Sequence, residues 1–204
     1  KIAILGTGGT IASRIDYKTG AVNPAFSAEE LYSIIPELSA YANINTELVS
    51  NIASEQMNPE DWTNIAKRVI EKINEGNQGI IIGHGTDTMA YTSAALSFAL
   101  ENCPIPVIIT GAQRSTDRPS SDASLNMISS VIMASKKVLN GVYLAMHSSI
   151  EDNEVSIHSG TRVRKNHTSR RDAFQSIGVD PIAIVNQDKV TIGEESIKNN
   201  NQFD

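Results

Sequence analysis

Short apolar runs recur along the chain and alternate with longer segments whose apolar residues are spaced three and four apart. The runs cover residues 2–5, 80–82, 107–109 and 142–146, and the segment 44–49 can form a further strand. A strand that is apolar on both faces must be covered on both faces, which is typical of parallel sheets. Strands of this kind alternating with amphipathic helices predict an α/β fold, a flavodoxin-like doubly wound, mostly parallel sheet with helices on both faces.

The helices between these runs carry recognisable start signals. Ser27 and Glu30 form a capping box, and Asn58 followed by Pro59 is a typical cap and first helical residue. Two further helices are expected at 89–100 and from Asp122 to about residue 139. Beyond Ser176 the pattern weakens to one strand at 182–185 and a polar tail. The sequence therefore predicts one catalytic α/β domain at 1–180, with an edge strand and linker at 181–204 towards a C-terminal domain that this chain lacks.

Composition excludes several classes of protein. The net charge of −6 argues against a stand-alone nucleic-acid binder, which gathers enough basic residues to neutralise several phosphates. No apolar run approaches the length of a membrane span. The single cysteine, Cys103, excludes an intrachain disulfide framework and a cysteine metal cluster, and it favours a cytoplasmic location. No metal or organic cofactor is expected.

Two glycine- and threonine-rich loops follow predicted strands. The first is Gly6 to Ala12 and the second is Gly83 to Thr88. Ligands of doubly wound sheets bind beyond the carboxyl ends of the strands, where these loops lie. The first loop does not fit a dinucleotide fingerprint, because Ile11 stands where the third glycine is needed, and no phosphate-binding lysine follows it. Tight turns with threonine caps are the structural alternative, but two such loops at neighbouring strands favour hydroxyl chemistry.

A hydroxyl nucleophile needs a general base within hydrogen-bond reach. Asp87 lies in the second loop, and Lys136 lies near the end of the helix predicted from Asp122. A lysine that is desolvated near such a site loses its proton more readily. The neighbouring Lys137 leaves the choice of lysine open, and a solvated lysine at a helix end is the alternative for either residue.

The segments 7–12 and 84–88 resemble the two signature motifs of the L-asparaginase and glutaminase family, and the match in order and spacing covers nearly the whole chain. The resemblance implies a threonine-dependent amidohydrolase acting on glutamine or asparagine, and a homodimer. It also implies a set of catalytic residues, with Thr10 as nucleophile and a lid tyrosine: Thr10, Thr86, Asp87, Lys136 and Tyr17.

The same resemblance implies where the substrate is held. Ser54 and Glu55 match the loop that binds the α-carboxylate and α-amino groups, although the family commonly has Gln or Asp in place of Glu55. Gly9 and Gly85 belong to the turns whose backbone N–H groups stabilise the tetrahedral oxyanion.

Three stretches, 12–22, 111–123 and 167–174, resemble the branch of the family that supplies ammonia to archaeal tRNA-dependent amidotransferases. That branch implies a partner amidotransferase subunit and contact with tRNA(Gln) through the partner or through domains absent here. A free L-asparaginase is the alternative, and a ligand-binding module or a structural partner domain are hypotheses from other classes. The basic segment 162–171 can meet RNA phosphates or a partner, but charged loop segments are most often only solvated.

Overall fold

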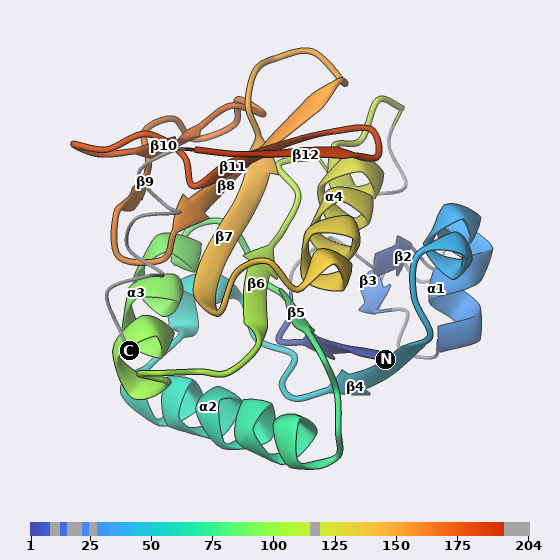
Figure 1. Ribbon diagram of the computed structural model, residues 1–204, viewed down its shortest axis with the longest axis vertical. Coiled ribbons are helices and arrows are strands. Elements are labelled where there is room, and N and C mark those ends of the chain that lie inside the picture. The colour runs from blue at the N-terminus through green and yellow to red at the C-terminus, as the bar shows by residue number, and fades with distance from the viewer. Residues whose placement is uncertain (9–12, 16–21, 25–27, 115–118, 194–204) are drawn as a thin grey trace.

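The computed structural model describes residues 1–8, 13–15, 22–24, 28–114 and 119–193. An eight-stranded sheet in the order β12-β11-β8-β7-β6-β5-β1-β4 forms its centre (Figure 1). Its strands are β1 (Ile2–Gly6), β4 (Ile44–Leu48), β5 (Ile80–Gly83), β6 (Pro106–Thr110), β7 (Gly141–His147), β8 (Glu154–Ser159), β11 (Ala183–Asn186) and β12 (Lys189–Ile192). Two small antiparallel pairs lie outside it, β2 (Ser13–Ile15) with β3 (Val22–Pro24), and β9 (Val163–Lys165) with β10 (Phe174–Ser176).

The five strands β4, β1, β5, β6 and β7 are parallel, and β8, β11 and β12 continue the sheet in antiparallel pairing. Every residue of β1, β5 and β6 is buried. This burial on both faces explains why these strands are unbroken apolar runs. The predicted fold class, a mostly parallel doubly wound sheet, is confirmed.

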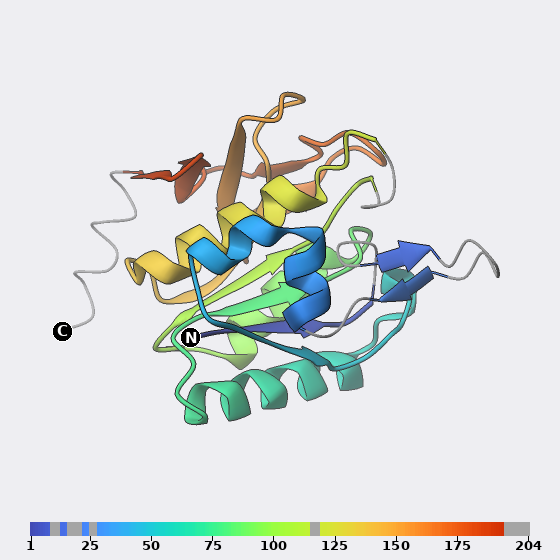
Figure 2. The same cartoon turned by 90° about the vertical axis from the view of Figure 1, so that its right-hand side faces the viewer.

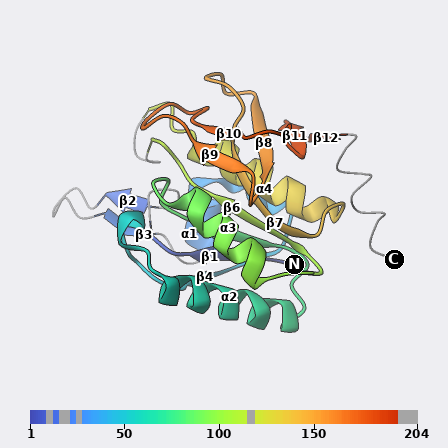
Figure 3. The ribbon, with the colours of Figure 1, turned by 90° about the vertical axis from the view of Figure 1, so that its left-hand side faces the viewer.

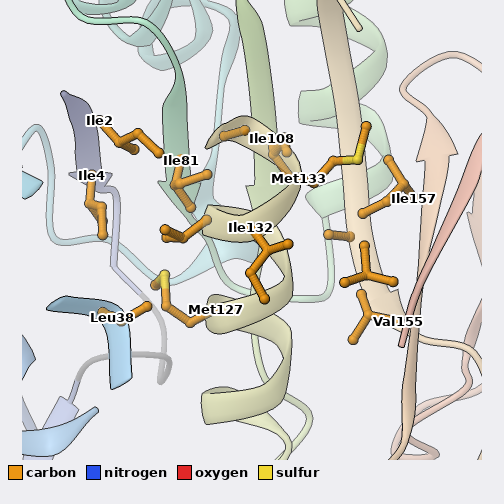
Figure 4. Packing of buried hydrophobic residues seen from close by; sticks show 14 of the residues in the cluster. Ile2, Ile4, Leu38, Ile81, Ile108, Met127, Ile132, Met133, Val155 and Ile157 are labelled. Atoms are coloured by element: carbon orange, nitrogen blue, oxygen red, sulfur yellow. The ribbon is translucent and has the colours of Figure 1, made fainter. Parts of the chain in front are cut away.

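Helices cover both faces of the sheet. They are α1 (Ala28–Ile34), α2 (Pro59–Asn74), α3 (Met89–Ala99) and α4 (Ala123–Lys136), with 3₁₀ turns η1 (Pro36–Ala40) and η2 (Ser54–Gln56). The alternation of side chains along β1 divides the core: Ile2 and Ile4 pack towards α1 and α4, and Ala3 and Leu5 pack towards α2 and α3. Figure 2 shows α4 and α1 on one side of the sheet and α2 on the other. Figure 4 shows the first of these two cores, with Met127 and Ile132 of α4 facing Ile81 and Ile108.

The helix boundaries follow local chemistry. The side chain of Asn58 accepts hydrogen bonds from the backbone N–H groups of Glu60 and Asp61, and the carboxylate of Asp61 accepts the N–H of Asn58, so the predicted cap is confirmed as a capping box. The helix α1 ends at Ile34 and a 3₁₀ turn begins at Pro36, because proline has no N–H to continue the helix. The predicted cap Ser27 lies outside the described residues.

The strands after residue 150 are harder to predict than those before it. The predicted strand at 182–185 is confirmed as β11, whereas β8, β9, β10 and β12 have no counterpart in the prediction. In β8, Ser156 and His158 are buried beside Val155 and Ile157, so polar residues on a buried strand hide its apolar pattern. Both β11 and β12 belong to the central sheet, and the division of the chain at residue 180 stays a prediction.

Candidate active site

The connections to and from β4 lie on opposite sides of β1, which makes β1 a topological switch point of the sheet. From β1 the chain passes to β4 on one side, and from β4 it returns through α2 to β5 on the other side of β1. Ligands of doubly wound sheets bind at such a switch point, beyond the carboxyl ends of the strands. Gly6 and Gly83 are register partners at those ends, so the first residues of the two loops singled out from the sequence lie side by side there.

The described part of the first loop, Thr7 and Gly8, packs against the backbone of neighbouring segments. The Thr7 hydroxyl donates to the Gly83 carbonyl oxygen at 2.9 Å, and Thr7 is 1% exposed, so this hydroxyl stabilises the loop. Gly8 has a φ of +110°, and a Cβ there would lie 2.3 Å from the carbonyl oxygen of Ile52. Only glycine permits this conformation and this close approach.

The second loop is held against the turn η2. A Cβ on Gly85 would lie 2.7 Å from Cβ of Ser54, so the absence of a side chain lets the two backbones meet. The Thr88 hydroxyl donates to the Ser54 carbonyl oxygen at 2.7 Å. Ser54 is buried, whereas Glu55 beside it is exposed. The structure thus brings the predicted residues Ser54, Gly85 and Thr86 into one neighbourhood.

A lysine joins this loop from a distant part of the chain. The ammonium group of Lys165 donates to the Thr86 hydroxyl oxygen at 2.8 Å and to the Asp87 carboxylate at 2.8 Å. The Lys165 side chain is only 13% exposed, whereas that of Asp87 is 66% exposed. Lys165 and Asp87 also line a cavity of about 230 Å³ together with residues 166–168. A hydroxyl, an amine and a carboxylate therefore meet at the switch point.

The β9–β10 hairpin positions Lys165. Successive side chains of a strand point to opposite sides, so Lys165 shares a face with Val163. Val163 and Phe174 are buried in the core beside α3, which directs this face inwards. Arg164 points the other way and lies 5.7 Å from the ring centroid of Tyr91. Figure 3 shows β9 and β10 in the part of the molecule that lies above α3.

The predicted grouping of Lys136 with Thr86 and Asp87 is wrong. Lys136 is the last residue of α4, which leads from the loop after β6 to the start of β7. The adjacent Lys137 lines a cavity with Lys1 and Ile2 at the start of β1. These residues lie at the amino edge of the parallel strands, and Thr86 lies at the carboxyl edge, because a crossover helix runs antiparallel to the strands it connects. Neither Lys136 nor Lys137 therefore occupies the position predicted from the sequence.

The sequence contains a weak indication that Lys165 lies on a strand with one buried face, but the surrounding charges hide it. The charges of segment 162–171 indicate a basic loop, yet Val163 and Lys165 are two residues apart, as in a strand with one buried face. The apolar pair Ala173 and Phe174 then supplies the buried part of the antiparallel partner. Only the tertiary structure shows that these short segments pair.

Three further predicted site residues, Gly9, Thr10 and Tyr17, lie outside the described residues.

Most cations of the basic segment already have partners within the chain. Arg170 forms a paired hydrogen bond with the Asp172 carboxylate at 2.8 and 2.7 Å. Arg171 donates to Asp152 at 2.6 Å and also to the carbonyl oxygen of Ser120. These contacts tie the hairpin loop to the loops that follow β6 and β7, so a structural role accounts for much of this charge.

The carboxylate of Asp152 connects that segment to a buried histidine. Nε2 of His147 lies 3.1 Å from Asp152 Oδ1, and Nδ1 lies 2.7 Å from Asn126 Oδ1. Burial by itself would raise the pKa of Asp152, but the hydrogen bonds from His147 and Arg171 outweigh it and the pKa is lowered. The carboxylate stays ionised and links the loop after β7 to the β9–β10 hairpin loop.

The other chemical features give no competing site. Within the described ranges, no three His, Cys, Asp or Glu residues gather as metal ligands. Cys103 is buried, and burial raises the pKa of its thiol, which disfavours the reactive thiolate. The helices of the described part include none that is both long and apolar enough to cross a bilayer.

Comparison with known proteins gives a consistent result. The family model described as "Asparaginase, N-terminal" matches residues 1–198. The chain is 52% identical over 197 residues to a subunit of the glutamyl-tRNA(Gln) amidotransferase of Methanosphaera stadtmanae, covering 97% of this chain and 44% of that protein. It is 55% identical over 183 residues to the corresponding protein of Pyrococcus abyssi, covering 90% of this chain and 42% of that protein. The chain thus spans less than half the length of these curated relatives.

Solved structures agree with the fold. The thermostable L-asparaginase from Thermococcus kodakarensis superposes with a TM-score of 0.80 at 38% identity, over 94% of this chain and 55% of that one. A probable cytoplasmic L-asparaginase from Campylobacter jejuni gives a TM-score of 0.80 at 31% identity, over 95% and 58% of the two chains.

Proposed function

Because this chain belongs to the asparaginase family, we propose that it supplies catalytic residues to an amidohydrolase that releases ammonia from the side-chain amide of glutamine. The contact of Lys165 with both Thr86 and Asp87 at the switch point carries the proposal. A binding module of the same fold would not need a largely buried lysine in contact with a hydroxyl and a carboxylate. Amide cleavage uses such a group, because protons must leave the attacking hydroxyl and reach the departing nitrogen.

In the proposed mechanism, the hydroxyl of Thr10 attacks the amide carbon and forms a tetrahedral intermediate. Ammonia then leaves, and water attacks the resulting ester to release the acid and restore the hydroxyl. Thr86 exchanges protons with the reacting groups, and Lys165 behind it accepts or donates the transferred proton. Asp87 balances the positive charge of Lys165 whenever that amine is protonated.

The substrate is proposed to lie between the two loops. Ser54 and Glu55 bind its α-carboxylate and α-amino groups, and Tyr17 closes over it. The backbone N–H groups at Gly9 and Gly85 stabilise the negative charge that develops on the amide oxygen.

The ammonia is proposed to serve a second protein. The names of the relatives from Methanosphaera stadtmanae and Pyrococcus abyssi describe a tRNA-dependent amidotransferase. By this proposal a partner amidotransferase subunit uses the ammonia to convert Glu-tRNA(Gln) into Gln-tRNA(Gln) in the cytoplasm. The intact protein forms a homodimer, and tRNA contacts come from the partner or from residues outside this chain.

A free L-asparaginase is the second candidate, favoured by the similarity to two solved asparaginases. It would convert asparagine to aspartate without any need for a partner. A protein that feeds a partner wastes glutamine whenever it acts without an acceptor, so its activity is expected to depend on the complex. Coupling of this kind needs a bias of a few kcal/mol between two conformations of the site.

One experiment tests the assignment of the lysine. In the intact protein, Lys165→Met is expected to lower ammonia release by at least about 100-fold, because proton transfer contributes roughly this much to catalysis. Lys136→Met is the matched control, with the same change of side chain at the opposite edge of the sheet, and it should retain the parent activity. A Lys165→Met protein as active as the Lys136→Met protein would refute the proposed site.

A second experiment separates the two candidate functions. Hydrolysis of glutamine and of asparagine is measured with the intact protein alone, then with the partner subunit, and then with the partner and Glu-tRNA(Gln). Glutamine hydrolysis that rises in the complex supports the amidotransferase role. Rapid cleavage of asparagine by the isolated protein, unchanged by either addition, identifies a free asparaginase.

A further inference from the structure

The second loop contains a buried histidine, His84, that the mechanism above does not use. His84 follows β5, is 1% exposed, and has hydrogen-bond partners at both ring nitrogens. Its Nδ1 atom lies 2.6 Å from the carbonyl oxygen of Gly85. A carbonyl oxygen only accepts, so Nδ1 carries the proton and donates it to Gly85.

The other ring nitrogen receives a hydrogen bond from α3. Nε2 of His84 lies 2.9 Å from the hydroxyl oxygen of Thr92. Burial lowers the pKa of His84, so the ring is neutral near pH 7 and Nε2 is unprotonated. Thr92 is therefore the donor in this contact, because a neutral imidazole with a proton on Nδ1 accepts at Nε2.

Helix α2 completes the arrangement. The indole N–H of Trp62 donates to the same Thr92 hydroxyl oxygen at 2.9 Å. Indole is a donor only, so the Thr92 hydroxyl accepts from Trp62 and gives its own proton to His84. A directed chain of hydrogen bonds runs from Trp62 on α2, through Thr92 on α3, to His84 and the Gly85 carbonyl. We call these three residues, Trp62, Thr92 and His84, the relay.

We propose that His84 is a positioning residue, which fixes the Gly85–Thr86 peptide so that the Thr86 hydroxyl stays on Lys165. The Gly85 carbonyl belongs to the same peptide group as the backbone N–H of Thr86. Glycine allows this peptide to rotate more freely than any other residue would, so it needs an external anchor. The relay holds the carbonyl through His84, and Ser54 fills the space where a side chain of residue 85 would lie.

The relay also selects the tautomer of His84 that can hydrogen-bond to the Gly85 carbonyl. A neutral histidine has two tautomers, and only the form with a proton on Nδ1 can hold the Gly85 carbonyl. Thr92 selects this form by donating to Nε2, and Trp62 in turn directs the Thr92 hydroxyl. Two helices that pack against the sheet thereby determine the orientation of a peptide at the proposed active site. This inference rests on the proposed amidohydrolase function.

The test uses Thr92 in the intact protein, because valine has nearly the shape of threonine and lacks its hydroxyl. Thr92→Val should lower kcat for amide hydrolysis by about tenfold or more, with KM within about twofold, since misplacement of a reacting group acts on the chemical step. Thr92→Ser restores the hydroxyl and should return kcat to within about threefold of the parent. Thr63→Val is the matched control, because the Thr63 hydroxyl donates to the Pro59 carbonyl oxygen on the exposed face of α2; it should leave both constants unchanged.

A second measurement reads the relay without any activity. In protein labelled with ¹⁵N-histidine, the NMR signals of His84 should show a protonated Nδ1 and an unprotonated Nε2, and Thr92→Val should abolish this preference. A proton on Nε2 in the parent protein refutes the relay whether or not the protein is active.

The outcomes distinguish this inference from the function on which it rests. A Thr92→Val protein with the kcat of an active parent refutes the positioning role and leaves the amidohydrolase intact. A loss of kcat that Thr92→Ser does not reverse also refutes it, because the hydroxyl is then not the group that matters. A parent protein that cleaves no amide, alone or in complex, overturns the proposed function and the positioning role together.

Discussion

His158 is predicted to make the domain sensitive to mild acid. It lies on β8, is 2% exposed, and its Nδ1 atom lies 2.8 Å from the hydroxyl of Ser176. Its Nε2 atom is the only buried side-chain nitrogen or oxygen of the described part that has no hydrogen-bond partner. Burial lowers the pKa of His158 from 6.5 to about 4, because the charged form of the ring would lose its hydration in the core.

The magnitude follows from linkage between protonation and folding. The unfolded chain takes up a proton at His158 below about pH 6.5, and the folded chain does so only near pH 4. The stability from neutral His158 is therefore present above pH 6.5 and is lost as the pH falls towards 4. At about 1.4 kcal/mol for each unit of pKa difference, the loss between pH 7 and pH 4 is about 3 kcal/mol.

The assay is the free energy of opening of the β8 and β11 amides, from hydrogen–deuterium exchange corrected for intrinsic rates at pH 7, 6, 5 and 4.5. Burial also lowers the pKa of His84, so a variant is needed to isolate the contribution of His158. His158→Asn keeps a polar atom near Ser176 but does not titrate, and its pH slope should be shallower by up to about 1.4 kcal/mol per pH unit. Equal slopes in the two proteins would refute the reasoning, whatever the absolute stability of the variant.

Gly85→Ala should lower amide hydrolysis by at least about tenfold, because its Cβ would lie 2.7 Å from Cβ of Ser54, and ammonia release measures this loss. Asn58→Ala should cost about 1 kcal/mol in urea unfolding by removing the cap of α2, and hydrolysis should be unchanged. Val163→Ala should lower the free energy of unfolding by about 2 kcal/mol and also reduce hydrolysis, since Val163 anchors the strand that carries Lys165. Arg164→Ala, on the exposed face of the same strand, should change neither the stability nor the hydrolysis greatly.

The central sheet is predictable from local pattern because its strands are buried on both faces. Short apolar runs such as Ile80 to Ile82 are best explained as buried strands, and Asn58 followed by Pro59 marks the start of α2. The strands β8 and β9 escape prediction for opposite reasons. In β8 buried polar residues interrupt the apolar pattern, whereas the single buried valine of β9 stands between two exposed arginines. Local sequence pattern predicts a strand least well where the strand is short and only a few of its residues are buried, by contacts with neighbouring elements.

The lysine shows where inference from sequence spacing fails. The family resemblance assigns the catalytic role to Lys136 near the end of α4, but a crossover helix returns to the amino edge before the next strand begins. Lys165 is separated from Asp87 by 78 positions and reaches it because the hairpin packs over α3. Lys136 therefore lies at the amino edge of the sheet, whereas the lysine that contacts Thr86 and Asp87 lies at the carboxyl edge.

The sequence by itself determined the alternation of buried strands with amphipathic helices, and hence the doubly wound sheet and the edge at which its glycine and threonine loops meet. Hydrophobic periodicity and turn chemistry are local, so a single sequence contains them. Only the tertiary structure decided which lysine joins Thr86 and Asp87, that Trp62 and Thr92 set the state of His84, and that Arg171 holds loops together. Each of these contacts joins side chains from separate elements, and their geometry exists only after the elements have packed.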